Sequence, residues 1–266
     1  FDELLFPKHS LGANILGTQE TVNSFKQSDL NAFIARNLDT SRIVISSIGK
    51  HPHEKVFKWA EKHLGHIPVQ RNQVKRILPP SMLPMEKITK RGLNQSYVAL
   101  GRQSYAIKHP DRLAFFMLIN LLGGPSMNSL LNVSIREKRG LVYSIEANFT
   151  SYVDSGFWAI YFGTESNQVA KSVKLIHKEF DKLKDRRLSP AQLLKIKSQL
   201  KGQMAMAEES NLNFMLMMAK SLLDREKIET LEEIFEQIDL VSSEQLQSLA
   251  QEMFQSEQLS YLIFEP

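Results

Sequence analysis

Residues 120–164 read NLLGGPSMNSLLNVSIREKRGLVYSIEANFTSYVDSGFWAIYFGT, and this stretch decides the fold. A helical apolar run enters it and stops at Gly123-Gly124-Pro125, because glycine frees the backbone and proline cannot continue a helix. Apolar residues between 130 and 135 predict a second helix that ends at Gly140. Aromatic and β-branched residues at 157–162 then predict a strand that follows a turn. This order of elements predicts an α+β domain.

Two residues of this stretch suit the binding of a peptide carbonyl. Arg136 falls in the last turn of the second predicted helix, where the helix dipole favours cations, and Tyr143 follows at the start of the next strand. An arginine fork and a phenol that converge on one point can hold a carbonyl oxygen or a developing oxyanion. The alternative interpretation is structural, with a solvated arginine at a helix end and a half-buried strand tyrosine. Spacing alone leaves both interpretations open.

The same residues carry a resemblance to a known family. The segment LGGPSMNSLLNVSIREKRGLVYSIEANFTSYVDSGFWAIYFGT resembles the signature of the second half-domain of the M16 metallopeptidases, which include relatives of pitrilysin, insulin-degrading enzyme and mitochondrial processing peptidase. Residues 1–49, with LLFPKHSLGANILGTQETVNSF, resemble the closing segment of the family's first half-domain. The resemblance therefore covers nearly the whole chain.

The resemblance implies a fold and a division of roles. The fold would be the LuxS/MPP-like metallohydrolase fold, an α+β architecture with a mainly antiparallel sheet backed by helices. The chain would hold the end of one half-domain and one complete half-domain. In the family, the first half-domain carries an H-x-x-E-H zinc motif and a further Glu ligand, and the second supplies an Arg and a Tyr to the substrate. These match Arg136 and Tyr143, which we expect to be catalytic and substrate-binding residues.

Prolines mark the expected domain boundary. Residues 67–84 contain four prolines and few large apolar residues between 70 and 75, which is typical of an extended, semi-stiff connector. We expect residues 1–68 to close the first half-domain, residues 69–84 to form the linker, and residues 85–266 to form the second half-domain. A helix after Ser28 and a strand at 42–48 match a helix and strand 216 residues later, in agreement with a duplicated domain.

Composition predicts a soluble globular protein. The 266 residues are 42% hydrophobic and 23% charged, and no apolar run reaches the roughly 18 residues of a membrane helix. The absence of cysteine excludes disulfides, thiolate metal sites and cysteine nucleophiles. The net charge of +4 comes from dispersed Lys and Arg without interleaved aromatic residues, which argues against nucleic-acid binding. We expect a bacterial cytoplasmic or periplasmic protein, and composition does not separate the two compartments.

Other kinds of chemistry find little support. His51, His53, His63 and His66 lie close together in sequence, but a proline and a helix end separate them. Solvated surface histidines are therefore the favoured interpretation, and no metal ligand is assigned. His177 lies on a lysine-rich helix face without an identifiable nucleophile, which argues against a Ser-His-Asp triad.

The sequence thus predicts the C-terminal, substrate-clamping portion of a zinc-dependent endopeptidase that cleaves peptides or small unfolded polypeptides in an enclosed chamber. We expect zinc in the full-length parent, upstream of Phe1, no cofactor within this portion, and no activity of this portion alone. Expected partners are the peptide substrate and a zinc-bearing half-domain of the same chain or of another subunit, in a homo- or heterodimer. The alternative is a non-catalytic M16-like partner subunit or chamber wall that assists an active subunit.

Overall fold

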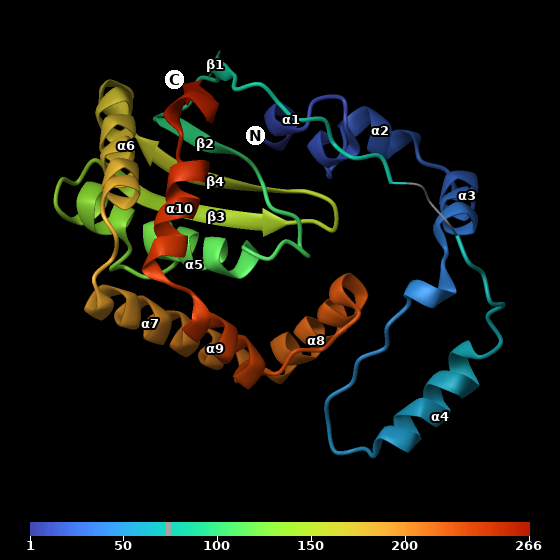
Figure 1. Ribbon diagram of the computed structural model, residues 1–266. Helices are drawn as coiled ribbons and strands as arrows, with labels where there is room; N and C mark the ends of the chain where they lie inside the picture. The colour runs from blue at the N-terminus through green and yellow to red at the C-terminus, as the bar shows by residue number, and fades with distance from the viewer. Residues whose placement is uncertain (73–75) are drawn as a thin grey trace. The chain divides into compact units, whose positions relative to one another are not determined.

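The computed structural model describes residues 1–72 and 76–266, which form two compact units (Figure 1). The first unit contains Phe1–Ala13, Leu78–Gly202 and Glu232–Pro266, and the second contains Asn14–Ile77 and Gln203–Leu231. The change from one unit to the other at residues 77–78 lies inside the predicted linker, of which residues 73–75 are outside the described part. The domain limits at residues 68 and 85 stay a prediction.

A five-stranded sheet organises the first unit. Its strands are β1 (Glu86–Lys90), β2 (Ser96–Ser104), β3 (Val142–Ser151), β4 (Gly156–Thr164) and β5 (Ser260–Glu265). The strand order is β1-β5-β2-β4-β3, and every neighbouring pair is antiparallel except β1 with β5. The predicted α+β fold with a mainly antiparallel sheet is therefore confirmed.

Helical segments of the first unit accompany this sheet. The helical elements of the first unit are α1 (Asp2–Leu5), η1 (Ser10–Gly12), α5 (Arg112–Gly123), η3 (Asn132–Glu137), η4 (Ser166–Gln168), α6 (Val169–Asp185), most of α7 (Pro190–Glu208), α9 (Leu231–Leu240), α10 (Ser243–Met253) and η5 (Ser256–Gln258). Among the described residues, none of the helices is both long and apolar enough to cross a bilayer.

An aromatic core joins one face of the sheet to α5, α6 and α10. Trp158 of β4 is fully buried, with ring centroids at 6.5 Å from Phe115, 5.9 Å from Phe180 and 5.1 Å from Phe254. The last two rings stack on each other at 4.5 Å. Each buried ring of this size contributes about 1.5–3 kcal/mol by leaving water. This core fixes the sheet on which the candidate site is built.

The opposite face of the sheet is covered only in part. The short segment of α1 and η1 packs Phe6 against Phe157 at 6.0 Å and Phe1 against Tyr161 at 6.2 Å. The Gln103 side-chain amide holds this segment by donating to the Leu5 carbonyl at 2.9 Å. Beyond this cover the face is open, and it carries the candidate site described below.

The second unit contains helices that correspond to helices of the first unit, and its described residues form no sheet. It contains α2 (Gln19–Ser24), α3 (Gln27–Asn37), η2 (Thr40–Arg42), α4 (His53–Leu64) and α8 (Asn211–Arg225). The pair α3 and η2 stands 216 residues before α10 and η5, which confirms the local repeat seen in the sequence.

The predicted strand at 42–48 is wrong for this structure. Its backbone is extended at Ile43, with φ −100° and ψ 123°, but residues 43–48 belong to no sheet. A strand needs a neighbour for its backbone hydrogen bonds, and the described residues of the second unit contain no strand to pair with it. Ile43 and Ile45 accordingly remain 49% and 54% exposed.

Candidate functional site

Arg136 lies in a widened helical turn. The segment η3 is a π-helix, in which the Lys138 amide donates to the Val133 carbonyl five residues back at 3.1 Å. Segments of this kind are rare and occur often at functional sites. The Arg136 side chain is 39% exposed, and its ion pair with Glu137 is long, at 3.7 Å. Its guanidinium therefore keeps donors available for another group.

A left-handed glycine connects this turn to the next strand. Gly140 has φ +58°, a conformation that glycine adopts without the steric penalty of a side chain. Its amide donates to the Arg136 carbonyl at 2.7 Å, and the Leu141 amide donates to the Ile135 carbonyl at 3.2 Å. The Thr164 hydroxyl donates to the Leu141 carbonyl at 2.6 Å, which fixes the start of β3 beside the end of β4.

Tyr143 lies in a β-bulge at the start of β3. The register passes from Val142 opposite Thr164 to Ile145 opposite Phe162, so Tyr143 and Ser144 together face Gly163. A bulge redirects side chains and is common beside active sites. The Tyr143 side chain is 85% exposed, an unusual position for a large aromatic residue in a strand. Arg136 and Tyr143 thus both lie on irregular backbone, on either side of one glycine turn.

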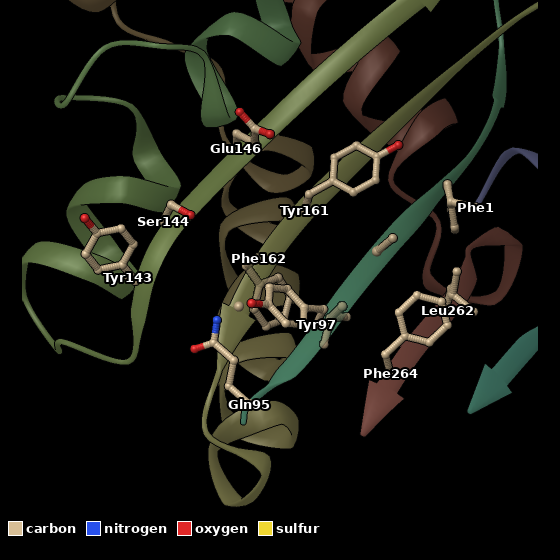
Figure 2. A pocket seen from close by; sticks show the side chains of 13 residues that line it. Phe1, Gln95, Tyr97, Tyr143, Ser144, Glu146, Tyr161, Phe162, Leu262 and Phe264 are labelled. Atoms are coloured by element: carbon tan, nitrogen blue, oxygen red, sulfur yellow. The ribbon is translucent and has the colours of Figure 1, made fainter. Parts of the chain in front are cut away.

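A cavity of about 300 Å³ opens beside Tyr143 on the uncovered face of the sheet (Figure 2). Aromatic side chains from four strands, β2, β3, β4 and β5, line it, together with Glu146 of β3. Tyr97 of β2 stands opposite both Gly163 and Phe264 in the sheet register. The glycine keeps the floor clear, because a Cβ at Gly163 would lie 2.9 Å from Gln95 Nε2 and 3.4 Å from Tyr97 Cε1. Arg136 is not among the described residues that line this cavity.

Burial and two nearby carboxylates act on the phenol of Tyr161 in the cavity wall. Burial first, and then the negative charges of Asp2 and Glu146, together raise the pKa of Tyr161 to about 12. The phenol therefore stays neutral at physiological pH and can act as a hydrogen-bond donor. Among the described residues that line the cavity, Glu146 is the one with a charged side chain.

The sequence did not point to Glu146, Tyr97 or Tyr161 as site residues. Their signal is weak, because each is an ordinary residue type for a strand position that is less buried than its two neighbours or exposed. Only strand pairing brings them together, since Tyr97 and Tyr161 lie far apart in sequence. Arg136 and Tyr143, in contrast, were found by spacing and resemblance, and their convergence on one ligand atom stays a prediction.

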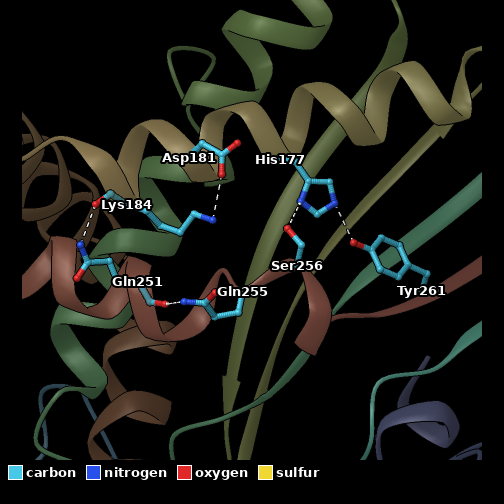
Figure 3. Close-up of polar contacts among 7 residues, drawn as sticks. All are labelled: His177, Asp181, Lys184, Gln251, Gln255, Ser256 and Tyr261. Carbon is cyan, nitrogen blue, oxygen red and sulfur yellow. Dashed lines mark hydrogen bonds and ion pairs between the residues drawn. The ribbon is translucent and has the colours of Figure 1, made fainter.

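A second polar cluster lies on α6, on the helix-covered side of the sheet (Figure 3). Ser256 Oγ is 3.0 Å from His177 Nδ1, so a hydroxyl that the sequence did not identify stands beside this histidine. His177 Nε2 is 2.8 Å from the Tyr261 hydroxyl. Both ring nitrogens are therefore engaged, and Asp181 pairs with Lys184 at 3.0 Å instead of orienting the imidazole. The cluster joins α6 to β5 and lacks the order of a Ser-His-Asp triad.

The family model described as "Peptidase M16 inactive domain" matches residues 24–200. The chain belongs to the M16 peptidase family. The predicted resemblance is therefore confirmed, and the match spans the π-helical turn, the bulge and most of the sheet.

Similar sequences include members of this family named as proteases. The chain is 32% identical over 250 residues to "Uncharacterized zinc protease YmxG" of Bacillus subtilis, an alignment that covers 94% of this chain and 60% of that protein. It is 27% identical over 259 residues to mitochondrial-processing peptidase subunit beta of Saccharomyces cerevisiae, covering 92% of this chain and 56% of that one. The M16 chain described here thus spans somewhat over half the length of these relatives.

Solved M16 structures share the fold. A peptidase M16 inactive domain from Pseudomonas fluorescens superposes with a TM-score of 0.89 at 19% identity, covering 99% of this chain and 63% of that chain. A protease from Helicobacter pylori superposes with a TM-score of 0.87 at 21% identity, covering 100% and 65%. At these identities the likeness establishes the architecture alone.

Proposed function

We propose that this chain is the substrate-holding portion of an M16 zinc endopeptidase. In this proposal Arg136 and Tyr143 donate hydrogen bonds to the carbonyl of the peptide bond that is cleaved, and to the oxyanion that forms on it. The observation that carries the proposal is the 85% exposed Tyr143, held by a β-bulge at the rim of a cavity on the open sheet face.

The donors are suited to this role by their geometry. A guanidinium offers five N–H donors and a phenol offers one O–H donor. The π-turn and the bulge fix the backbone positions of the two residues, and their exposed side chains can turn toward a peptide. A donor that meets the oxyanion more strongly than the ground-state carbonyl lowers the barrier of the chemical step.

The ligands for zinc are expected outside this chain. The described residues contain no group of three or more His, Asp or Glu that could hold a metal ion. We therefore propose that zinc, in the protein that contains this chain, is held by other residues. Those residues would belong to a zinc-bearing half-domain facing the open sheet across an enclosed chamber.

The alternative function is that of a non-catalytic partner subunit. Mitochondrial-processing peptidase subunit beta is named as a subunit, and the chain also superposes on a subunit of complex III2 from Candida albicans with a TM-score of 0.84. In that role the same pair, Arg136 and Tyr143, would serve an active site completed by another chain. Homo- or heterodimers are proposed for both alternatives.

Zinc analysis and peptide hydrolysis separate these functions. We expect the longer protein to bind about one zinc per chain and to cleave a quenched-fluorescent peptide, and we expect the 266-residue chain alone to do neither. A longer protein without zinc that cleaves only after addition of a second subunit would support the partner role. Stoichiometric zinc and hydrolysis by the 266-residue chain itself would contradict both.

A further inference from the structure

We propose that a second cavity, at the end of β2, binds a carboxylate that carries a short aliphatic tail, with the Arg102 guanidinium as its partner. Two kinds of molecule offer this group: a free aliphatic acid and the C-terminal end of a peptide. The inference does not depend on the proposed function, because neither Arg136 nor Tyr143 is among the described residues that line this Arg102 cavity.

The Arg102 cavity forms where β2 extends beyond its neighbour. β5 begins at Ser260, which pairs with Gly101, so Arg102 and Gln103 pair with β4 on one side and with no described residue of β5 on the other. A space of about 300 Å³ lies at this end of the pair. Its lining comes from α1, residues 81–84, β2, η5 and β5, all within the first unit.

Two hydrogen bonds fix residues 81–84, which form one wall of the cavity. The Gln103 side-chain amide donates to the Pro80 carbonyl at 3.0 Å, and the Met85 amide donates to Ser260 Oγ at 3.2 Å. The wall is thus held at both of its ends. Ser260 lines the cavity and is only 3% exposed, and its hydroxyl accepts from Met85, so it keeps its own proton for another acceptor.

Arg102 gives this cavity a positive charge. It has the only charged side chain among the described residues of the lining. Its Nη1 donates to the Gln258 side-chain oxygen and, at 3.2 Å, to the Glu252 carbonyl. Because Gln258 also lines the cavity, the guanidinium lies at the cavity wall.

The guanidinium keeps one edge for a ligand. Among the described residues, no hydrogen-bond acceptor engages Nε or Nη2 of Arg102, and no carboxylate forms an ion pair with it. Nε and Nη2 are two of the atoms from which arginine donates parallel hydrogen bonds to the two oxygens of a carboxylate.

Burial makes an anion favourable beside Arg102. Burial lowers the pKa of Arg102, and the charge of Glu252 opposes this shift. Arginine nevertheless stays protonated in proteins, so a partly desolvated positive charge remains. Glu252 is not its ion-pair partner, since the Glu252 Oε2 atom accepts the Tyr105 hydroxyl at 2.8 Å. A carboxylate in the cavity would supply that partner.

The rest of the lining suits an aliphatic tail. Leu5, Met82, Leu83 and Pro84 contribute apolar surface, which favours a tail that leaves water. A volume of about 300 Å³ is at the lower limit of ligand sites and suits one short acid or one terminal residue. A cationic ligand would meet a charge of its own sign, and a neutral amide would leave the guanidinium without a counterion.

Binding of matched acids and amides tests this inference. Ligand-observed NMR titrations with the 266-residue chain would compare isovalerate with isovaleramide, and an acetylated tripeptide that ends in leucine with its C-terminal amide. The members of each pair differ only in the carboxylate. Arg102→Gln and Arg102→Lys would be compared with Arg186→Gln, which replaces an exposed arginine outside the cavity.

The expected result is a preference for acids that depends on Arg102. At least one acid should bind about tenfold more tightly than its amide, Arg102→Gln should reduce this ratio below about twofold, and Arg186→Gln should preserve it. Arg102→Lys should retain part of the preference, because it keeps the charge and loses the fork. Amides that bind as tightly as their acids, no binding by either acid, or an unchanged ratio in Arg102→Gln would overturn the inference. The comparison of acid with amide uses the parent chain, so it does not depend on the folding of a variant.

The two acids distinguish the source of the carboxylate. A peptide acid that binds at least tenfold more tightly than isovalerate would support a peptide C-terminus as the ligand. Isovalerate that binds as tightly as the peptide acid, or more tightly, would support a free aliphatic acid. Both results support a carboxylate site at Arg102.

Discussion

Gly123 controls how closely α5 approaches the strand that carries Tyr143. A Cβ at this position would lie 2.8 Å from both the Cβ and the amide nitrogen of Ala147, and 3.3 Å from Leu131 Cδ1. The first two atoms belong to a paired strand and cannot rotate away. Overpacking of this kind costs about 1–3 kcal/mol, and the gain in helix propensity is small at the last residue of α5. We expect Gly123→Ala to lower the free energy of unfolding by about 1–2 kcal/mol.

Gly202→Ala is the matched control for this substitution. Gly202 lies inside α7, and an added Cβ meets no atom within 4 Å, so alanine should raise stability by about 0.5–1 kcal/mol. Urea unfolding would be followed by Trp158 fluorescence in a Trp59→Phe background, so that the reporter is the core of the first unit alone. Because Ala147 lies on β3, the strand that carries Tyr143, Gly123→Ala should also weaken peptide binding. A Gly123→Ala chain as stable as the parent would refute the close approach of α5 to β3.

Two further predictions concern the bulge and His177. Deletion of Ser144 would leave one residue opposite Gly163 and make β3 regular, so peptide affinity should fall at least tenfold, as measured by anisotropy, while urea unfolding changes by less than about 1 kcal/mol. Unchanged affinity would argue against a role for the bulge. Burial lowers the pKa of His177; nearby Asp181 opposes the shift and Lys184 adds to it. The unfolded chain therefore takes up a proton near pH 6.5 that the folded chain resists, so stability should fall from pH 7 to pH 5. His177→Gln should flatten this dependence in urea titrations, and an equally steep loss in the variant would refute it.

Local signals sufficed to predict most elements around the site. The Gly-Gly-Pro sequence ends α5 at Gly123, because these residues act on their own backbone. The bulge also has a local signal, since the buried residues Val142 and Ile145 are three apart where a regular strand has two. The π-turn has no comparable composition signature, so the sequence predicts an ordinary helix there.

Pairing between strands that are distant in sequence determines features of the fold that local sequence patterns do not predict. Residues 43–48 and β5 follow equivalent helices, yet only β5 forms a strand, because β1 and β2 flank it on both sides. The cavity has the same origin. Tyr97 meets Phe264 and Gly163 through sheet register, and no spacing along the chain reveals that juxtaposition.

The central claim is that Arg136 and Tyr143 stabilise the reacting carbonyl. Its most direct test is steady-state hydrolysis of one peptide by the longer protein, with Arg136→Ala, Tyr143→Phe and the control Lys138→Ala, a neighbouring exposed cation. Loss of one oxyanion donor predicts a fall in kcat by about 10² or more for the first two variants, with zinc content unchanged. Lys138→Ala should keep the parental kcat. Parental kcat in both Arg136→Ala and Tyr143→Phe would contradict the account.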